Sequence, residues 1–532
     1  MAYYKDLREY IERLESLGKL VRIKREINKD TELMPLVRWQ FRGLPESERK
    51  AFWFDNIVDA RGKKYDMPVV VACHAASREI YAIGMGCKKD EIMEKWDYAQ
   101  LNPVKPVMVE NGIVHQEVHT GEKLLEHGGL DEFPVPISTP GIDNAPYLTA
   151  ANWVSKDPDT GIRNIGNYRS MVKSQTRTGV FCLDPQHLNI HWQLCRAKGI
   201  PLQAAAVLGA PPSLGFAATA KLPYGVDEYD IAGGIAGEPL ELVKCKTIDL
   251  EVPATAHIVL EGEIPTDSLE REAPFGEFTG YVGKESLTMY FNVKCITHCH
   301  RPVYNAFLSQ FPPSESSKLR GIAFEAVFYK FLKHDCVIPG ILDVAFHESS
   351  GSENYCVIQM KKSHQSQVWQ ALNGVVARHP WYRKIVIAVD EDIDPRDADS
   401  VNWALSFCMQ PHRDIRIVTG RSSDLDPSAA PPGDPDWMYP KPEGCSSVLI
   451  NATRKWPYPP TSLPKEEYMV KARQIWEEEG LGQLVPRVPW HGYTLGHWTD
   501  ENELEARLAL NGRHCETGKK IEQQRTYLNN GA

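Results

Sequence analysis

Two glutamates flank a turn of proline and glycine in residues 271–278, whose sequence is REAPFGEF. Proline fixes its own φ angle and glycine permits positive φ, so we expect a stiff, bent backbone between Glu272 and Glu277. Burial at an apolar turn raises the proton affinity of a carboxylate, and a nearby arginine lowers it. Such a glutamate can donate a proton near neutral pH, which makes Glu277 the first candidate for a general acid. The alternative is a solvated loop with two exposed glutamates.

A second set of polar residues could bind a divalent cation. Asn164, His187 and Glu238 combine an amide oxygen, an imidazole and a carboxylate, the ligand types of octahedral Mn²⁺, Fe²⁺ or Mg²⁺ sites. Three protein ligands would leave positions open for a phosphate. The intervals are long, however, and a competing interpretation takes His187 and His191 as a zinc pair on one helix face, although no glutamate follows His187 as in metalloprotease motifs.

Three further patterns have the side chains of ligand sites. Residues 295–300 (CITHCH) resemble zinc ligands, but residues 291–295 are typical of a strand, whose neighbours point to opposite faces, so we do not expect the four ligands to converge. The run 233–238 (GGIAGE) resembles a phosphate-binding loop without the full dinucleotide fingerprint. The acidic residues 390–392 could bind a hard cation, but we expect them to cap the helix that follows.

The elements that must position these residues divide the chain into four segments. Residues 1–125 open with an amphipathic helix at Leu7–Leu17 and predict a small α/β domain. Residues 126–315 contain strand-like runs, the last at 303–307, separated by Pro, Gly and Asp turns, which predicts a β-barrel or sandwich with helical insertions. Closed barrels place functional groups at their mouths.

The last two segments predict a second α/β domain and a tail. Residues 316–460 contain a helix at 317–334, a buried strand at 384–389 and a helix at 397–407, an order that indicates a parallel or mixed sheet. Residues 461–532 contain helices at 465–479 and 501–509. Between them lie aromatic residues that we expect to reach a partner subunit, namely Trp490, Tyr493 and Trp498.

Charge and cysteine content exclude several classes of protein. A net charge of -10 without a Lys/Arg run argues against a nucleic-acid binder. No stretch approaches the roughly 20 apolar residues of a membrane span and no apolar signal core opens the chain, so we expect a cytoplasmic protein without membrane association. The 12 cysteines include no CxxC pair and are expected to be reduced and buried.

Six motifs, in order, resemble those of the UbiD family of reversible decarboxylases. They are residues 156–161 (KDPDTG), 164–171 (NIGNYRSM), 185–187 (PQH), 235–238 (IAGE), 272–277 (EAPFGE) and 455–457 (KWP). The resemblance runs from the opening helix to about residue 480. It implies a multidomain α+β and α/β fold, in which a split β-barrel flavin-binding middle domain is flanked by a small N-terminal α/β domain and a C-terminal α/β oligomerisation domain with an extended tail.

The resemblance also implies prenylated FMN as the cofactor, with a divalent metal (Mn²⁺, Fe²⁺ or Mg²⁺) and K⁺ near its phosphate. By motif match the metal ligands would be Asn164, His187 and Glu238. The residues that would bind the cofactor are these three together with Ile165, Arg169, Ser170, Met171 and Gln186.

Arg169, Glu272 and Glu277 would form the catalytic network of this family. An arginine between two carboxylates is a charge-assisted clamp that keeps one glutamate ionised while the other exchanges its proton. The implied reaction is non-oxidative decarboxylation of an aromatic carboxylic acid or acyl-CoA through a covalent intermediate between substrate and prenylated FMN, after which Glu277 protonates the carbon. Direct loss of CO₂ would leave an aryl carbanion whose electrons lie outside the π system.

The resemblance gives less detail on the substrate, the direction of the reaction and the partners. The tail, with WHGY at 490–493, is similar to that of an anaerobic aromatic-degrading branch, so we expect conversion of phthaloyl-CoA to benzoyl-CoA. The alternatives are a carboxylase subunit for a phenol derivative such as phenylphosphate, a decarboxylase of a free hydroxybenzoate, and a flavin-carrying assembly subunit without turnover. A homo-oligomer (dimer or hexamer) and a flavin prenyltransferase that supplies the cofactor are implied. Two departures from the family pattern, 314–318 (SESSK) and Asn451, concern substrate or potassium binding.

Overall fold

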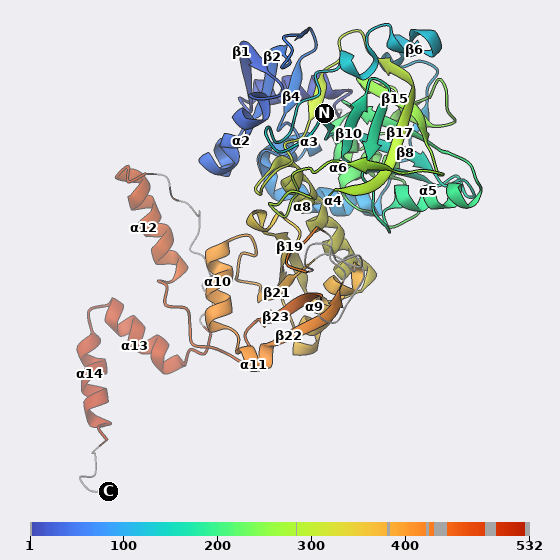
Figure 1. The fold of residues 1–532 in the computed structure, drawn as a ribbon. Coiled ribbons are helices and arrows are strands. Elements are labelled where there is room, and N and C mark those ends of the chain that lie inside the picture. Colours follow the sequence, from blue (N-terminus) through green and yellow to red (C-terminus); the bar gives the residue numbers. More distant parts are fainter. Residues whose placement is uncertain are drawn as a thin grey trace.

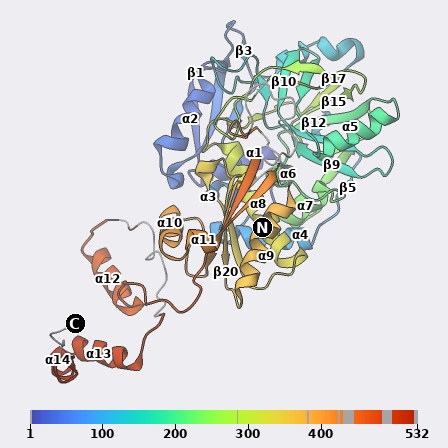
Figure 2. The ribbon, with the colours of Figure 1, turned by 60° about the horizontal axis from the view of Figure 1, so that its bottom comes forward.

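The structure, a computed structural model, describes residues 3–283, 285–379, 383–421, 425–429, 444–482, 484 and 496–526. The N-terminal and middle parts lie beside each other at the top of Figure 1, and the C-terminal sheet lies below them. The last three helices extend away from this body, as the second view in Figure 2 also shows. Within the described ranges no helix has both the length and the apolar character needed to cross a membrane.

The N-terminal part begins with the predicted amphipathic helix. Asp6 caps it by accepting a hydrogen bond from the Glu9 amide (3.0 Å), and the buried side chains recur at helical spacing. Its five-stranded sheet includes a strand from the middle segment, because β18 (Tyr304–Ala306) pairs in parallel with β4. The prediction that residues 303–307 join the barrel is therefore wrong. The other elements are α1 (Leu7–Ser16), β1 (Leu20–Asn28), α2 (Leu33–Gly43), β2 (Ala51–Val58), β3 (Lys64–Tyr65), β4 (Val69–Val71), α3 (Arg78–Met85) and α4 (Ile92–Leu101).

The middle part is built on a ten-stranded antiparallel sheet in which β7, β10, β11, β17, β15, β12, β8 and β9 follow one another, while β6 and β16 also pair with β17. The long strand β17 pairs with four of the other strands, β6, β11, β15 and β16. Closure of the sheet into a split barrel stays a prediction. The elements are β5 (Val107–Met108), β6 (Glu117–Thr120), β7 (Tyr147–Leu148), β8 (Asn152–Lys156), β9 (Arg163–Asn167), β10 (Ser170–Ser174), β11 (Arg177–Val180), α5 (His187–Ala197), β12 (Leu202–Leu208), α6 (Pro212–Thr219), α7 (Glu228–Ala236), β13 (Glu241–Lys244), β14 (Glu251–Pro253), β15 (Ile258–Ile264), β16 (Glu270–Glu272) and β17 (Ser286–His298).

Helix α8 (Glu315–Lys330) joins the middle part to the C-terminal domain, and it is buried on most sides, including at the charged residues Lys318 and Glu325. Leu319 and Val327 pack in the core of the middle part, whereas Phe324 and Phe328 pack in the core of the C-terminal domain. Helix α8 therefore fixes the position of one domain against the other.

Residues 314–318, which depart from the family pattern, form the start of α8. The Ser314 hydroxyl accepts a hydrogen bond from the Ser317 amide, and the Ser317 hydroxyl accepts one from the Ser314 amide. Glu315 accepts hydrogen bonds from the amides of Ala72 (2.8 Å) and His74 (2.9 Å) in the N-terminal part. This segment thus ties the first domain to α8.

The C-terminal domain has a mixed five-stranded sheet covered on both faces, as its sequence order predicted. Alternate residues of its central strand divide between two cores: Val386 and Ala388 pack on the α9 side, and Ile387 and Val389 on the α10 side. The elements are β19 (Ile341–Phe346), β20 (Tyr355–Met360), α9 (Gln365–Arg378), β21 (Ile385–Asp390), α10 (Ala398–Phe407), α11 (Pro411–Asp414), β22 (Ile415–Arg421) and β23 (Cys445–Ala452).

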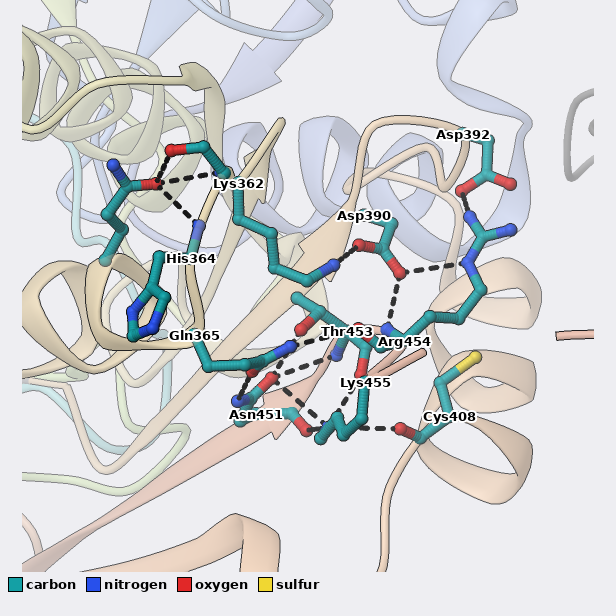
Figure 3. A network of polar contacts seen from close by, with 12 residues as sticks. Lys362, His364, Gln365, Asp390, Asp392, Cys408, Asn451, Thr453, Arg454 and Lys455 are labelled. Atoms are coloured by element: carbon teal, nitrogen blue, oxygen red, sulfur yellow. Dashed lines mark hydrogen bonds and ion pairs between the residues drawn. The ribbon is translucent and has the colours of Figure 1, made fainter. Parts of the chain in front are cut away.

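A polar network at the end of β21 and β23 accounts for several residues singled out in the sequence (Figure 3). Asp390 pairs with Lys362 and accepts a hydrogen bond from the Arg454 amide (2.6 Å), while Arg454 also pairs with Asp392. The prediction that residues 390–392 cap the next helix is wrong, because Asp397 caps α10.

The same network contains Asn451 and the KWP motif. The Asn451 Oδ1 atom accepts hydrogen bonds from the amide and hydroxyl of Thr453, and its Nδ2 atom donates to Gln365 Oε1 (2.8 Å). Lys455 donates to the carbonyl oxygens of Thr453 (2.6 Å) and Asn451 (2.7 Å). These hydrogen bonds therefore stabilise the local fold of the C-terminal domain.

The tail contains helices α12 (Glu466–Glu478), α13 (Asp500–Leu510) and α14 (His514–Gln523), which confirms the two predicted helices. None of the three buries a residue, and apolar side chains such as Ile475 and Leu504 are exposed. Trp498 is partly exposed, whereas Trp490 and Tyr493 lie outside the described residues. A partner subunit for this tail stays a prediction.

Candidate active site

Arg169 lies between the two glutamates that flank the proline and glycine turn. Its Nη2 atom donates to Glu272 Oε2 (2.9 Å), and its Nη1 atom forms an ion pair with Glu277 Oε1. The guanidinium also lies 3.7 Å from the centre of the Phe181 ring, a cation–π contact. All three charged side chains are at most 11% exposed. The cluster is therefore held in place and largely excluded from water.

Local backbone contacts shape the turn that carries Glu277. Glu272 ends β16, and the Ala273 carbonyl accepts a hydrogen bond from the Tyr147 hydroxyl (2.9 Å). The Glu277 amide then donates to the Tyr281 carbonyl (2.9 Å), and a bridge joins Gly276 to Val282. The turn is thus the tip of a short hairpin, and it brings Glu277 back towards Arg169.

A third acid, which the sequence did not single out, lies close to this cluster. Burial raises the pKa of Asp143 to about 6, although hydrogen bonds from the Thr139 and Gly276 amides and the charge of Arg169 oppose the shift. Burial likewise raises the pKa of Glu272 despite Arg169. Several carboxyl groups thus share one guanidinium, and a proton can reside among them near neutral pH.

Two adjoining cavities meet beside Arg169. The first, about 130 Å³, contains Arg169 and Glu277, and the second, about 210 Å³, contains Asn164, Ile165 and His187. The residues that line both cavities are Asn167, Tyr168, Gln186 and Lys221. A long molecule could therefore place one end at the acids and the other at Asn164 and His187.

The second cavity contains a donor set that fits a divalent cation. Asn164 lies on β9, His187 begins α5, and Glu228 begins α7. Burial and the charge of Lys221 lower the pKa of His187, which keeps its imidazole neutral, and burial raises the pKa of Glu228 to about 8. The Asn164 Nδ2 atom is buried without a hydrogen-bond partner among the described residues. The set thus contains an amide, a neutral imidazole and a buried carboxyl group whose raised pKa indicates that nearby positive charge does not offset its burial. Such ligands are suited to Mn²⁺, Fe²⁺ or Mg²⁺.

The structure does not bring Glu238 to this donor set, so its assignment as a ligand needs correction. Glu238 is exposed and follows Gly237, which ends α7 with a φ of +77°. Glu228 begins the same helix, so about 12 Å of helical rise separates it from Ala236, two residues before Glu238. Glu228 accepts a hydrogen bond from the Ile165 amide (2.8 Å), which holds it beside Asn164.

The glycine run 233–238 is not a loop either. Gly233 and Gly234 lie inside α7, where a Cβ atom would approach Val104 O to 2.3 Å and Ala99 O to 2.8 Å. The absence of side chains thus allows α7 to pack closely on the chain around α4. Close packing, and not a phosphate, explains this part of the sequence.

The remaining sequence-predicted residues divide between the cavities and their surroundings. Gln186 lines both cavities and Ile165 lines the second, whereas Ser170 and Met171 of β10 line neither. His191 is buried one turn after His187, and its Nδ1 atom lies 2.9 Å from the Ser155 hydroxyl. The described residues show no cluster that contains the ligands of 295–300 together, as expected, although His298 joins other residues.

Comparisons with known proteins find matches along most of the chain. Three domain families match it, described as the N-terminal, Rift-related and C-terminal domains of 3-octaprenyl-4-hydroxybenzoate carboxy-lyase, at residues 11–99, 107–311 and 318–452 respectively. An uncharacterised protein of Archaeoglobus fulgidus is 30% identical over 467 residues, which are 85% of this chain and 92% of that protein.

Two solved structures extend the similarity to the fold. One is an evolved dimeric form of the UbiD-class enzyme HmfF from Pelotomaculum thermopropionicum in complex with prFMN, with 29% identity, a TM-score of 0.75, and coverage of 88% of this chain and 100% of that one. The other is the closed form of vanillic acid decarboxylase from Sedimentibacter hydroxybenzoicus, with 26% identity, a TM-score of 0.76, and coverage of 90% and 100%.

Proposed function

This chain belongs to the UbiD family of carboxy-lyases, and from that premise we propose that it catalyses the reversible, non-oxidative decarboxylation of an aromatic carboxylic acid with prenylated FMN. The observation that carries this proposal is the buried cluster of Arg169, Glu272 and Glu277 at the wall of a cavity. A structural ion pair needs one acid, whereas this arginine is shared by two acids and lines a cavity together with one of them, Glu277.

The two adjoining cavities fit the proposed cofactor. Asn164, His187 and Glu228 would hold a divalent cation at the phosphate end, and this ion would supply the positive charge that the buried Glu228 carboxylate lacks. The flavin ring would then lie towards Arg169 and Gln186. When bound, prenylated FMN supplies an electron sink for the bond that releases CO₂. A potassium ion near this phosphate stays a prediction.

The side chains of this protein would then bind the substrate and move the proton. Arg169 keeps Glu272 and Glu277 close together, so that one can be ionised while the other carries a proton. The Glu277 carboxyl is the proton donor to the ring carbon that loses CO₂, and Arg169 fixes its position. Phe278 and Phe307 line the same cavity and exclude water, which favours loss of a charged carboxylate as neutral CO₂.

The lining of the first cavity favours a flat aromatic acid. Its apolar members are Phe181, Leu183, Phe275, Phe278, Phe307, Leu319 and Leu425, and its polar members beyond the shared residues include Thr149, Ser309, Ser316 and Arg320. One of the structures named above is a decarboxylase of such an acid, the vanillic acid decarboxylase. Conversion of phthaloyl-CoA to benzoyl-CoA stays a prediction, as do carboxylation of a phenol derivative and decarboxylation of a free hydroxybenzoate.

Two partners belong to the same proposal. A flavin prenyltransferase would supply the cofactor. A second copy of the chain would cover the tail helices, whose apolar side chains are exposed, to give a dimer or a larger homo-oligomer.

Co-expression with a flavin prenyltransferase, without oxygen, tests the proposal. Aromatic acids and their thioesters are screened for CO₂ release, and labelled bicarbonate tests the reverse direction. Glu277→Gln should retain the flavin spectrum and lose more than about 100-fold in turnover, the usual contribution of a general acid. Glu285→Gln is the matched control, because Glu285 lies on the same hairpin and pairs with Arg271 at the surface. Wild-type turnover in Glu277→Gln would contradict the assignment, and a loaded protein without turnover on any acid would favour a flavin-carrying subunit.

A further inference from the structure

A group of histidines and glutamates lies at one edge of the ten-stranded sheet, and none of them lines either cavity. His119 comes from β6, His298 from the end of β17, and Glu132 ends a short 3₁₀ turn. The strand pairing sets Ile296 opposite His119, so that His298, two residues further along, lies on the same face. The register therefore brings the two imidazoles together, at the outer edge where Figure 1 labels β6.

The distances in this group are long for hydrogen bonds and suitable for a tetrahedral metal site. The Nε2 atoms of His119 and His298 are 3.3 Å apart, and His298 Nε2 lies 3.4 Å from Glu132 Oε1. Hydrogen bonds between such groups are commonly about 2.7–3.2 Å long. Around a tetrahedral zinc ion, with bonds of about 2.0–2.1 Å to nitrogen and oxygen, neighbouring ligand atoms are about 3.3 Å apart.

The protonation of the two rings agrees with ligand roles. The Nδ1 atom of His298 lies 2.8 Å from the Cys299 carbonyl oxygen, which only accepts, so this nitrogen carries the hydrogen. A bound cation would replace the Nε2 proton that Glu132 favours, so that the Nε2 lone pair would point at the group, and the backbone carbonyl fixes the ring orientation. His119 is 5% exposed, and its Nδ1 atom has no hydrogen-bond partner in the described part of the chain. With the hydrogen on Nδ1, His119 too would direct its Nε2 lone pair at the group.

The turn that precedes Glu132 offers further ligands. Glu126 and His127 have ligand atoms within 4.8 Å of each other and of a ligand atom of His119. The His127 ring centre lies 4.7 Å from that of His119. Both residues are exposed, so either can approach a bound ion from the solvent side.

We propose that His119, His298 and Glu132 bind a zinc-class divalent cation, with His127 or Glu126 as the fourth ligand. Two imidazoles and a carboxylate suit zinc among the divalent ions, and the two separations from His298 Nε2 match those between ligands of a tetrahedral ion. The ion would fasten residues 121–132 to the edge of the sheet. That segment continues to Asp143 beside Arg169, so the ion acts as a structural brace for one wall of the active site.

Metal binding by purified full-length variants tests this site separately from the flavin site. The background is His187→Asn, which disables the proposed cation set of the second cavity. In this background the cluster should take up one Co²⁺ per chain with the intense visible bands of tetrahedral coordination, and zinc should displace it. Adding His298→Asn or Glu132→Gln should weaken Co²⁺ binding by at least about 100-fold. Loss of a residue that only hydrogen-bonds to a ligand lowers metal affinity by about 10–100-fold, so a larger effect indicates a direct ligand.

The control variant is His300→Asn, because His300 is exposed and pairs with Glu117 at the surface. It should bind Co²⁺ as the background protein does. Glu132 is only partly buried, so Glu132→Gln keeps the test valid if His298→Asn fails to fold, and near-ultraviolet circular dichroism checks the fold of each variant. The absence of tetrahedral Co²⁺ bands, or unchanged affinity in Glu132→Gln, would overturn the proposal whatever the enzyme activity.

Discussion

Replacing Gly233 with alanine should destabilise the protein and displace α7, because this glycine lies where the helix contacts the chain before β5. A Cβ atom at this position would lie 2.3 Å from the Val104 carbonyl oxygen and 3.2 Å from Val104 Cβ, and a Cβ contact under 3.0 Å essentially never occurs. The carbonyl belongs to the backbone and cannot rotate away like a side chain. The helix itself must therefore move.

The size of the effect follows from two opposing contributions. Alanine in place of glycine within a helix gains about 1 kcal/mol through the lower entropy of the unfolded chain. Overpacking a filled core costs about 1–3 kcal/mol, and a clash with backbone lies at the upper end. We therefore expect a net loss of about 2 kcal/mol in the free energy of unfolding.

Urea unfolding and cofactor content together test this reasoning. Because Glu228 begins α7, a displaced helix should also lose bound metal and flavin. The control is Gly518→Ala in α14, where a Cβ atom meets nothing within 4 Å, so that stability should stay equal or rise by up to about 1 kcal/mol. A Gly233→Ala protein as stable as the wild type would refute the packing argument. Loss of flavin alone, without loss of stability, would instead favour a phosphate-binding role for the glycines.

Three further predictions concern other parts of the structure. Burial raises the pKa of Asp143 from 3.8 to about 6, so between these pH values the folded chain keeps a proton that the unfolded chain releases. The protonated Asp143 therefore contributes to stability below about pH 4, and this contribution is lost as the pH rises through 6. Relative to wild type, Asp143→Asn should therefore gain up to about 3 kcal/mol between pH 4 and pH 7 in urea unfolding. Glu228→Gln should lose bound Mn²⁺ and flavin by metal analysis and absorbance, whereas Glu238→Gln should retain both, because Glu238 is exposed. Asn451→Asp should cost about 1 kcal/mol in urea unfolding through repulsion of Gln365 Oε1, with turnover unchanged.

Elements with strong periodicity could be predicted from the sequence, and long-range pairings could not. The opening helix, α8 and the helix α10 follow from spacing and capping residues within each segment. The strand Tyr304–Ala306 was recognised as a strand, but its partner β4 lies more than 200 residues earlier in the chain. No local pattern distinguishes that partner from the neighbouring strands of the barrel.

The candidate active site shows the same division between residues that local motifs identify and contacts that depend on the tertiary structure. Motif spacing selected Arg169, Glu272 and Glu277, which the fold brings into contact, although their roles stay predictions. Glu238 was assigned as a ligand by its match to the IAGE motif at 235–238, and Glu228 was not considered. Asp227, which accepts a hydrogen bond from the Tyr229 amide as the N-cap of α7, was the signal that a helix begins there. Asp143 had no such signal, since its contacts depend on tertiary structure.

The helix direction also gives a physical reason why Glu228 and not Glu238 suits the proposed cation site. A helix N-terminus carries partial positive charge from its free amides, and α5 and α7 both begin at the second cavity, at His187 and Glu228. These two N-termini oppose the effect of burial, which raises the pKa of Glu228, and they would favour the phosphate of a flavin and, with it, a cation held by Asn164, His187 and Glu228. The opposite end of α7 carries partial negative charge, which would repel both Glu238 and a phosphate. Helix polarity and close glycine packing therefore both shape the cavity. The glycines determine how closely α7 packs against the chain around α4, and the free amides of its first turn give the cavity wall a partial positive charge.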